Sequence, residues 1–221
     1  MSETPSPTAP WWQRHVELIV VIMLGIVSVA TAYTSFQSSL YGGQSDDKIS
    51  QSEAKGTEAE SLYLEGNQQY VQDSQTIQQL SVLQVAAATG DPVAQAQYDE
   101  LYFIAVSEDL DAAILNAAAA DEAEPDFWHD PQADETYRAA LFGAYGDTSL
   151  ESEELRKVGD DLGYRGDLLG LFTALMAITL FLLGIAAVLK RPLMQWILIA
   201  TGGTIFLVTA ILTATVPFVW L

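Results

Sequence analysis

Two apolar stretches near the C-terminal end decide the fold. Residues 168–189 read LLGLFTALMAITLFLLGIAAVL, residues 193–216 read LMQWILIATGGTIFLVTAILTATV, and KRP stands between them. Neither stretch is charged, and each can cross a hydrocarbon core of about 30 Å as a helix that rises about 1.5 Å per residue. Because only three residues separate them, we predict a tight hairpin of transmembrane helices over 167–189 and 193–216, with its turn at 190–192.

A third apolar segment lies near the N-terminus. Residues 18–33 read LIVVIMLGIVSVATAY and continue into a hydroxyl-rich stretch. We predict a transmembrane helix over 16–41. The ATA at 30–32 also resembles a signal-peptide cleavage site, so removal of residues 1–32 stays an alternative. The long stretch before the segment, with few basic residues, favours an uncleaved anchor.

Basic residues indicate the orientation. Short loops rich in Lys and Arg stay in the cytoplasm. Lys190 and Arg191 lie between the last two spans, and Arg14 precedes the first. We therefore expect a multi-pass protein of the plasma membrane. The expected sides are cytoplasmic for 1–15 and 190–192, and extracytoplasmic for 42–166 and 217–221.

The segment between the first and second spans is strongly acidic. The chain of 221 residues has 29 acidic and 9 basic side chains, and 27 of the acids but only 6 of the bases lie between Asp46 and Asp167. That segment has a net charge of −21, which excludes an ordinary soluble globule when combined with the apolar spans. A surface this negative repels phosphate, so we expect no nucleic-acid partner.

The acidic segment carries helical signals. Residues 44–88 lack Pro and place apolar side chains at spacings of three and four, which is typical of an amphipathic helix with a weak seven-residue repeat. The repeat also includes Asp73 and Gln84, which favours packing on its own domain, although a true coiled coil stays an alternative.

Capping patterns divide the rest of this segment. They are Gly90-Asp91-Pro92, Ser107, Asp130-Pro131, and Thr148 with Glu151. They predict a helix over about 92–107, a further helix from Ser107 to about Ala120 and a loop over 121–131. A helix from Asp130-Pro131 to about Tyr145 follows, and the last helix begins at Thr148 and runs on into the second span. The fold class is an all-α membrane protein with three transmembrane helices and an acidic helical extracytoplasmic domain between the first and second.

Several stretches carry a family resemblance. They are ATAYTSFQSSLYGGQ (30–44), EAESLYLEGNQQYVQD (58–73), PDFW (125–128), ETYRAALFGAY (135–145) and GDLLGLFTALMAITLFLLGIA (166–186). In their order they resemble a group of uncharacterised bacterial membrane proteins with three spans and one helical outer insert. The resemblance covers most of the chain and implies architecture only. No activity is known for the group, so no functional residue follows from it.

No pattern typical of catalysis is present. The chain has no Cys and two His, and it lacks a G-x-S-x-G elbow, a phosphate loop, a dinucleotide fingerprint and H-E-x-x-H. We expect no enzyme activity, no catalytic residue and no cofactor.

One acidic loop is the best candidate for a metal site. Its oxygen-rich side chains suit Ca²⁺ or Mg²⁺, and they are Asp121, Glu122, Glu124, Asp126, His129 and Asp130. The spacing is not that of an EF-hand, and the Gly that such a loop requires is missing. A solvated run of charges is therefore favoured, and no metal site is predicted.

Small residues form stripes on the spans. The first span has Gly25, Ser28, Ala32, Ser35 and Ser39, and the second has Gly166, Gly170, Ala174 and Ala177. Helices in lipid associate closely at such stripes. Packing of the three spans within one chain is favoured over a subunit interface.

The expected function follows largely by exclusion. It is a non-catalytic, membrane-anchored structural or partner-binding module with its helical domain outside. The expected partners are the lipid bilayer and either a second copy or another membrane or envelope protein. The alternative is a subunit of an oligomeric cation-conducting pore under an acidic vestibule. Its lining hydroxyls would be Ser28, Thr31, Ser35 and Thr201.

Overall fold

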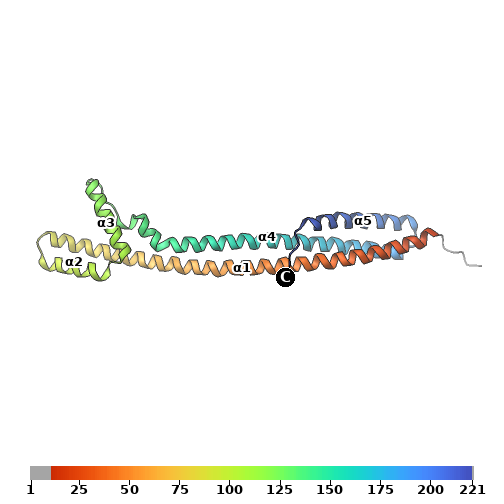
Figure 1. Ribbon diagram of the computed structural model, residues 1–221, viewed down its shortest axis with the longest axis horizontal. Coiled ribbons are helices and arrows are strands. Elements are labelled where there is room, and N and C mark those ends of the chain that lie inside the picture. The colour runs from red at the N-terminus through yellow and green to blue at the C-terminus, as the bar shows by residue number, and fades with distance from the viewer. Residues whose placement is uncertain (1–10, 221) are drawn as a thin grey trace, which may run out of the picture. The chain divides into compact units, whose positions relative to one another are not determined.

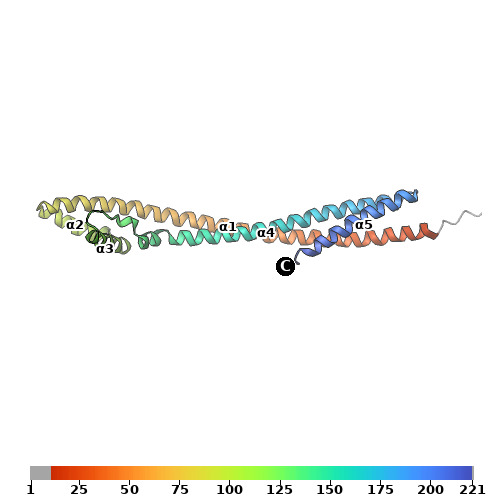
Figure 2. The same cartoon turned by 90° about the horizontal axis from the view of Figure 1, so that it is seen from above.

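The chain is all-helical. A computed structural model describes residues 11–220, with side chains from Val16 onward, and this part of the chain contains no strand. Predictions that concern Arg14, residues 1–10 or Leu221 lie outside the described residues. The elements are α1 (Trp11–Ala88), α2 (Pro92–Ala105), α3 (Glu108–Ala123), the 3₁₀ turn η1 (Pro131–Ala133), α4 (Glu135–Val188) and α5 (Pro192–Thr215) (Figures 1 and 2).

Three of these helices, α1, α4 and α5, contain stretches long and apolar enough to cross a membrane. The prediction of three apolar helical spans is thereby confirmed. Large apolar side chains on these stretches are exposed, with Val29 71%, Phe181 67% and Leu193 74% accessible. Such side chains suit contact with hydrocarbon rather than with water.

Two helices are longer than their local sequence indicates. The helices predicted to about Tyr41 and over 44–88 are one helix, α1, and the boundary predicted near Tyr145 and Thr148 is wrong because α4 continues through it. Each internal Gly costs about 1 kcal/mol of helix propensity relative to Ala. Packing along both helices outweighs that local cost.

The shorter helices begin at capping residues, mostly as predicted. Gly90 has a φ of +93°, Asp91 accepts hydrogen bonds from the N–H groups of Val93 and Ala94, and Ser107 caps α3. The start predicted at Pro131 for the next α-helix is wrong. That stretch is the turn η1, and α4 begins after Asp134, whose Oδ1 accepts from Thr136 N at 2.8 Å.

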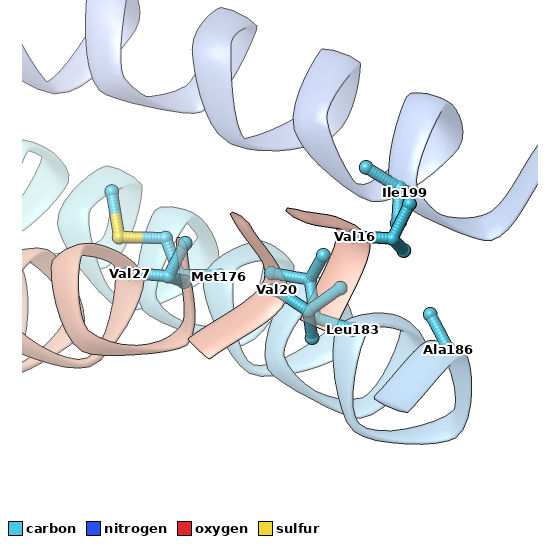
Figure 3. Close-up of a cluster of buried hydrophobic side chains, with 7 residues drawn as sticks. All are labelled: Val16, Val20, Val27, Met176, Leu183, Ala186 and Ile199. Carbon is cyan, nitrogen blue, oxygen red and sulfur yellow. The ribbon is translucent and has the colours of Figure 1, made fainter. Parts of the chain in front are cut away.

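The chain divides into two compact units, described separately here. The first comprises residues up to Ile49 together with those from Arg156, and the second is Ser50–Leu155. In the first unit, α1, α4 and α5 share one apolar cluster (Figure 3). Its buried members are Val16, Val20, Val27, Met176, Leu183, Ala186 and Ile199. Close packing of this set joins the three helices in that unit.

Serine hydroxyls join α1 to α4 in the first unit. Ser38 Oγ donates to Gly166 O and Ser45 Oγ donates to Gly159 O, both at 2.8 Å. A Cβ at Gly166 would lie 3.3 Å from Tyr41 Cβ, so the absence of a side chain permits this approach. Part of the predicted small-residue stripe on the second span therefore does serve packing within the chain.

The small-residue stripe on the first span does not serve packing within the chain. Its members Gly25, Ser28, Ala32, Ser35 and Ser39 are all exposed. The buried face of α1 carries Val20, Val27, Thr34 and Tyr41 at seven-residue spacing instead. Sequence periodicity identified a face of the helix, but larger side chains on another face make the packing contacts with the other helices of this unit.

The segment after α5 is held against α1 by polar side chains. Gln37, only 2% exposed, donates from Nε2 to Val219 O at 3.2 Å and accepts from Val219 N at 3.0 Å. Tyr41 OH donates to Pro217 O at 2.8 Å. Backbone groups that leave a helix in apolar surroundings need such partners.

The Gln37→Leu substitution is expected to release this segment while preserving the apolar packing of α1. Two hydrogen bonds to Val219 are lost, each worth about 1 kcal/mol net, so the amide of Val219 should exchange roughly tenfold faster or more. Hydrogen exchange on the full chain in nanodiscs measures this. Ser39→Ala is the control, since Ser39 bonds only within α1, and unchanged exchange in Gln37→Leu would contradict the assignment.

Candidate functional site

The second unit has a small core around α3. Leu110, Ala113 and Tyr137 are buried, and Tyr70 and Ile77 of α1 pack against them. Figure 1 shows α2 beside the C-terminal end of α1, with α3 following it. Four parts of the chain meet here, namely α1, α2, α3 and the segment that leads into α4.

A buried carboxylate lies within this core. Asp73, fully buried, accepts from Gln69 Nε2 at 2.8 Å and from Tyr137 OH at 2.7 Å. Burial and the hydrogen bond to Asp73 raise the pKa of Tyr137. The residue that interrupts the apolar repeat in the sequence is thus satisfied by a partner from α4.

Gln132 fastens the segment before α4 to α1. Its Nε2 donates to Tyr70 O at 3.0 Å, and its Oε1 accepts from Ser74 Oγ at 2.8 Å. Asp130 accepts from Gln132 N at 3.0 Å and caps η1. These bonds give the loop before η1 a fixed end.

A cavity of about 290 Å³ lies between α1, α2, α3 and this loop. That volume is near the lower end of the range for small-molecule sites. Its apolar wall is formed by Ile77, Leu80, Ile114, Ala117, Ala118 and Pro131.

The remaining wall is polar and aromatic. It is formed by Ser81, Gln84, Tyr98, Asp121, Trp128 and His129. Asp121 Oδ1 accepts from the backbone N–H of His129 at 2.7 Å, and His129 Nδ1 lies 2.8 Å from the same oxygen. The side chain of His129 and then its backbone N–H lower the pKa of Asp121, so this carboxylate is ionised at neutral pH. Trp128, which also lines the cavity, is 72% exposed.

Two neighbouring groups are also shifted. Burial and a hydrogen bond to Asp111 raise the pKa of Tyr102. The backbone N–H of Tyr137 and the amide of Asn116 lower the pKa of Asp134. Both shifts have a structural cause, because Tyr102 joins α2 to α3 and Asp134 caps α4. Neither residue lines the cavity.

The predicted acidic loop is only partly brought together. Asp121 and His129 meet, whereas Glu122, Glu124, Asp126 and Asp130 are exposed. Within the described residues, no group of three or more His, Asp or Glu could hold a metal ion. The pair serves the cavity wall and the shape of the loop.

The hydroxyls considered for a pore lie in the first unit. Ser28, Ser35 and Thr201 are exposed, and Thr31 is half-buried and donates to Val27 O at 2.7 Å. A hydroxyl bonded to its own helix is a common way to satisfy Thr in apolar surroundings. The single chain does not gather these four groups around a conduit.

Sequence reasoning missed the cavity and four residues of its polar and aromatic wall, Ser81, Gln84, Tyr98 and Trp128. Tyr98, Gln84 and Trp128 come from α2, α1 and the loop, so their meeting depends on the tertiary fold. One signal was available in PDFWHDP, where an exposed aromatic pair stands in a run of acids. An exposed Trp in such a charged loop is typical of a contact surface.

The chain matches no protein-family model, no curated protein and no solved structure.

Proposed function

We propose that this protein is a non-catalytic, membrane-anchored binding module whose helical second unit takes a small ligand outside the cell. The observation that carries the proposal is the cavity of about 290 Å³, with its apolar wall and its Asp121–His129 pair. Convergent polar groups opposite an apolar wall are typical of ligand sites. No catalytic constellation accompanies them in the sequence.

The proposed orientation rests on charge. Lys190 and Arg191 lie between α4 and α5 and favour a cytoplasmic turn, which places 42–166 on the extracytoplasmic side of the plasma membrane. The net charge of −21 between Asp46 and Asp167 suits a domain that stays clear of anionic headgroups.

Orientation is tested by cysteine labelling, because the chain has no Cys. Glu124→Cys should react with an impermeant maleimide on intact cells, whereas Arg191→Cys should react only after permeabilisation. Both residues are exposed in the structure, so access to the side chain does not limit either reaction. The reverse pattern of labelling would refute the proposed topology.

Ligand binding is tested by filling the cavity. Ala118 and Ala119 are neighbours on α3 and both are exposed, but only Ala118 lines the cavity. A set of cationic, neutral and anionic aromatic fragments should yield at least one that binds saturably to the full chain in nanodiscs. Ala118→Phe should weaken that binding at least tenfold, and Ala119→Phe should leave it within twofold. If no fragment binds, or if both variants behave alike, the proposal fails.

The exposed hydroxyls of Ser28 and Ser35 on α1 support one further candidate, a subunit of an oligomeric cation pore. The subunit count of the purified protein tests it first. A strict monomer of 24.0 kDa would eliminate the pore, since three mostly apolar helices cannot enclose a conduit. A closed oligomer would require flux measurements after reconstitution.

A further inference from the structure

No Lys or Arg lines the cavity. Residues 56–137 include every residue that lines it, and these 82 residues contain 17 Asp or Glu and no Lys or Arg. Basic residues in Ser50–Leu155 are limited to Lys55 and Arg138. Lys55 is already paired with Glu58 and Glu151, at 3.0 and 3.2 Å. A field of one sign raises the local concentration of ligands of the opposite sign.

The charge closest to the cavity is placed to meet a cation. Asp121 uses only Oδ1 for His129, and its Oδ2 has no hydrogen-bond partner among the described side chains and backbone. Asp121 also lies in the last turn of α3, where no basic residue is present. The C-terminal end of a helix carries partial negative charge, so an acid there is unfavourable and a nearby cation offsets it.

The other walls suit an apolar body with a cationic head. Trp128 and Tyr98 offer aromatic faces, which attract ammonium groups at close range. Ile77, Leu80 and Ile114 form a hydrocarbon floor that a bare metal ion would leave unused. A small ligand with both properties would satisfy the carboxylate, the rings and the floor together.

We infer that the cavity between α1, α2 and α3 binds a small organic ammonium ion with an apolar body, with Asp121 as its counter-ion and Trp128 as an aromatic wall. This inference rests on the proposed function and specifies the ligand class of that same site. An anion is disfavoured by the charge, and a neutral ligand gains nothing from it.

The test compares three probes of similar shape on the full chain in nanodiscs of neutral lipid. They are phenethylammonium, 2-phenylethanol and phenylacetate, measured by calorimetry and by Trp128 fluorescence. Trp128 is the only Trp in Ser50–Leu155, and Phe in place of the other four removes their signal. Phenethylammonium should bind at least tenfold more tightly than 2-phenylethanol, and phenylacetate should bind more weakly than both. The preference for the cation should fall as NaCl rises from 50 to 500 mM.

Two acids of one region provide matched variants. Asp121→Asn should weaken the binding of phenethylammonium at least tenfold and leave the affinity for 2-phenylethanol within threefold of that of the unmodified chain. Asp126→Asn removes the same charge from the exposed loop outside the cavity wall and should change phenethylammonium less than threefold. Trp128→Leu, followed by calorimetry, should also weaken the cation more than the alcohol.

The outcomes separate the inference from the function on which it rests. Equal binding of the cation and the alcohol to the unmodified chain overturns the ligand class and needs no variant that must fold. Equal losses in Asp121→Asn and Asp126→Asn overturn the role of Asp121. If the alcohol or the acid binds most tightly and Ala118→Phe abolishes that binding, the proposed function is retained and only the preference for cations is refuted. Saturation by Ca²⁺ in place of phenethylammonium would overturn the organic ligand.

Discussion

Gly66→Ala is expected to lower the free energy of unfolding of the second unit by about 2 kcal/mol, the overpacking cost less the gain in helix propensity. A Cβ at Gly66 would overlap the carbonyl oxygen of Leu141 and lie 3.1 Å from Phe142 Cε1. The oxygen belongs to the backbone of α4 and cannot rotate away. The substitution must therefore push α1 and α4 apart at this point. Urea titration of the full chain in nanodiscs, followed by hydrogen exchange of peptides from Ser50–Leu155, measures the loss.

Gly56→Ala is the matched control on the same helix. A Cβ there would lie 3.5 Å from Ser152 Oγ, an ordinary contact. With no overlap to relieve, Ala in place of Gly should stabilise the helix by about 0.5–1 kcal/mol. Opposite signs at the two glycines would show that close approach of α1 and α4 is specific to Gly66. A loss at both positions would contradict the helix packing described here.

Tyr137→Phe is expected to destabilise the second unit by about 2–3 kcal/mol, because a buried acceptor loses a partner that water cannot replace. Tyr137 is 1% exposed and Asp73 is fully buried, with 2.7 Å between the hydroxyl and Oδ2. The same exchange measurement should report faster opening of α3 and of the start of α4, since Tyr137 packs with Leu110 and Ala113.

A double-mutant cycle separates the hydrogen bond from the packing. Asp73→Leu with Tyr137→Phe replaces both partners by apolar groups, which often restores much of the stability lost when one partner is removed. The double variant should therefore be more stable than Tyr137→Phe alone, with a coupling of about 1–3 kcal/mol. Additive losses would mean that the two residues act independently.

The parts of the fold that depend on local chemistry were predictable. Residues 168–189 are apolar without interruption, and Gly90-Asp91-Pro92 places three residues whose backbone preferences agree, so the spans and the start of α2 followed from the sequence. The continuity of α1 and α4 did not follow. Gly42-Gly43, and Thr148 with Glu151, are local stop and start signals, and tertiary packing overrides such signals when it contributes more free energy than they cost.

The candidate site was predictable only in fragments. Asp121 and His129 both belong to the loop that the sequence marked for possible metal binding, and they do meet. Their other neighbours, Tyr98 and Leu80, come from α2 and α1, and no periodic pattern states which faces of separate helices meet. The exposed stripe that includes Gly25 shows the same limit, because a stripe identifies a face without identifying its partner.

The seven-residue repeat in α1 raises the question of what fixes the register of α1 against α4 in the second unit. Ser52, Ala59, Gly66, Asp73 and Leu80 are all buried and stand seven residues apart. A displacement of α1 along α4 by one repeat, about 10.5 Å, would bring another residue of this series to each position beside α4. Asp73 and Gly66 both oppose this move, because Asp73 would lose Tyr137 and a Cβ in the place of Gly66 would overlap the carbonyl oxygen of Leu141. One buried acid and one glycine thus exclude the shifted alignments that a uniform small-residue surface would permit.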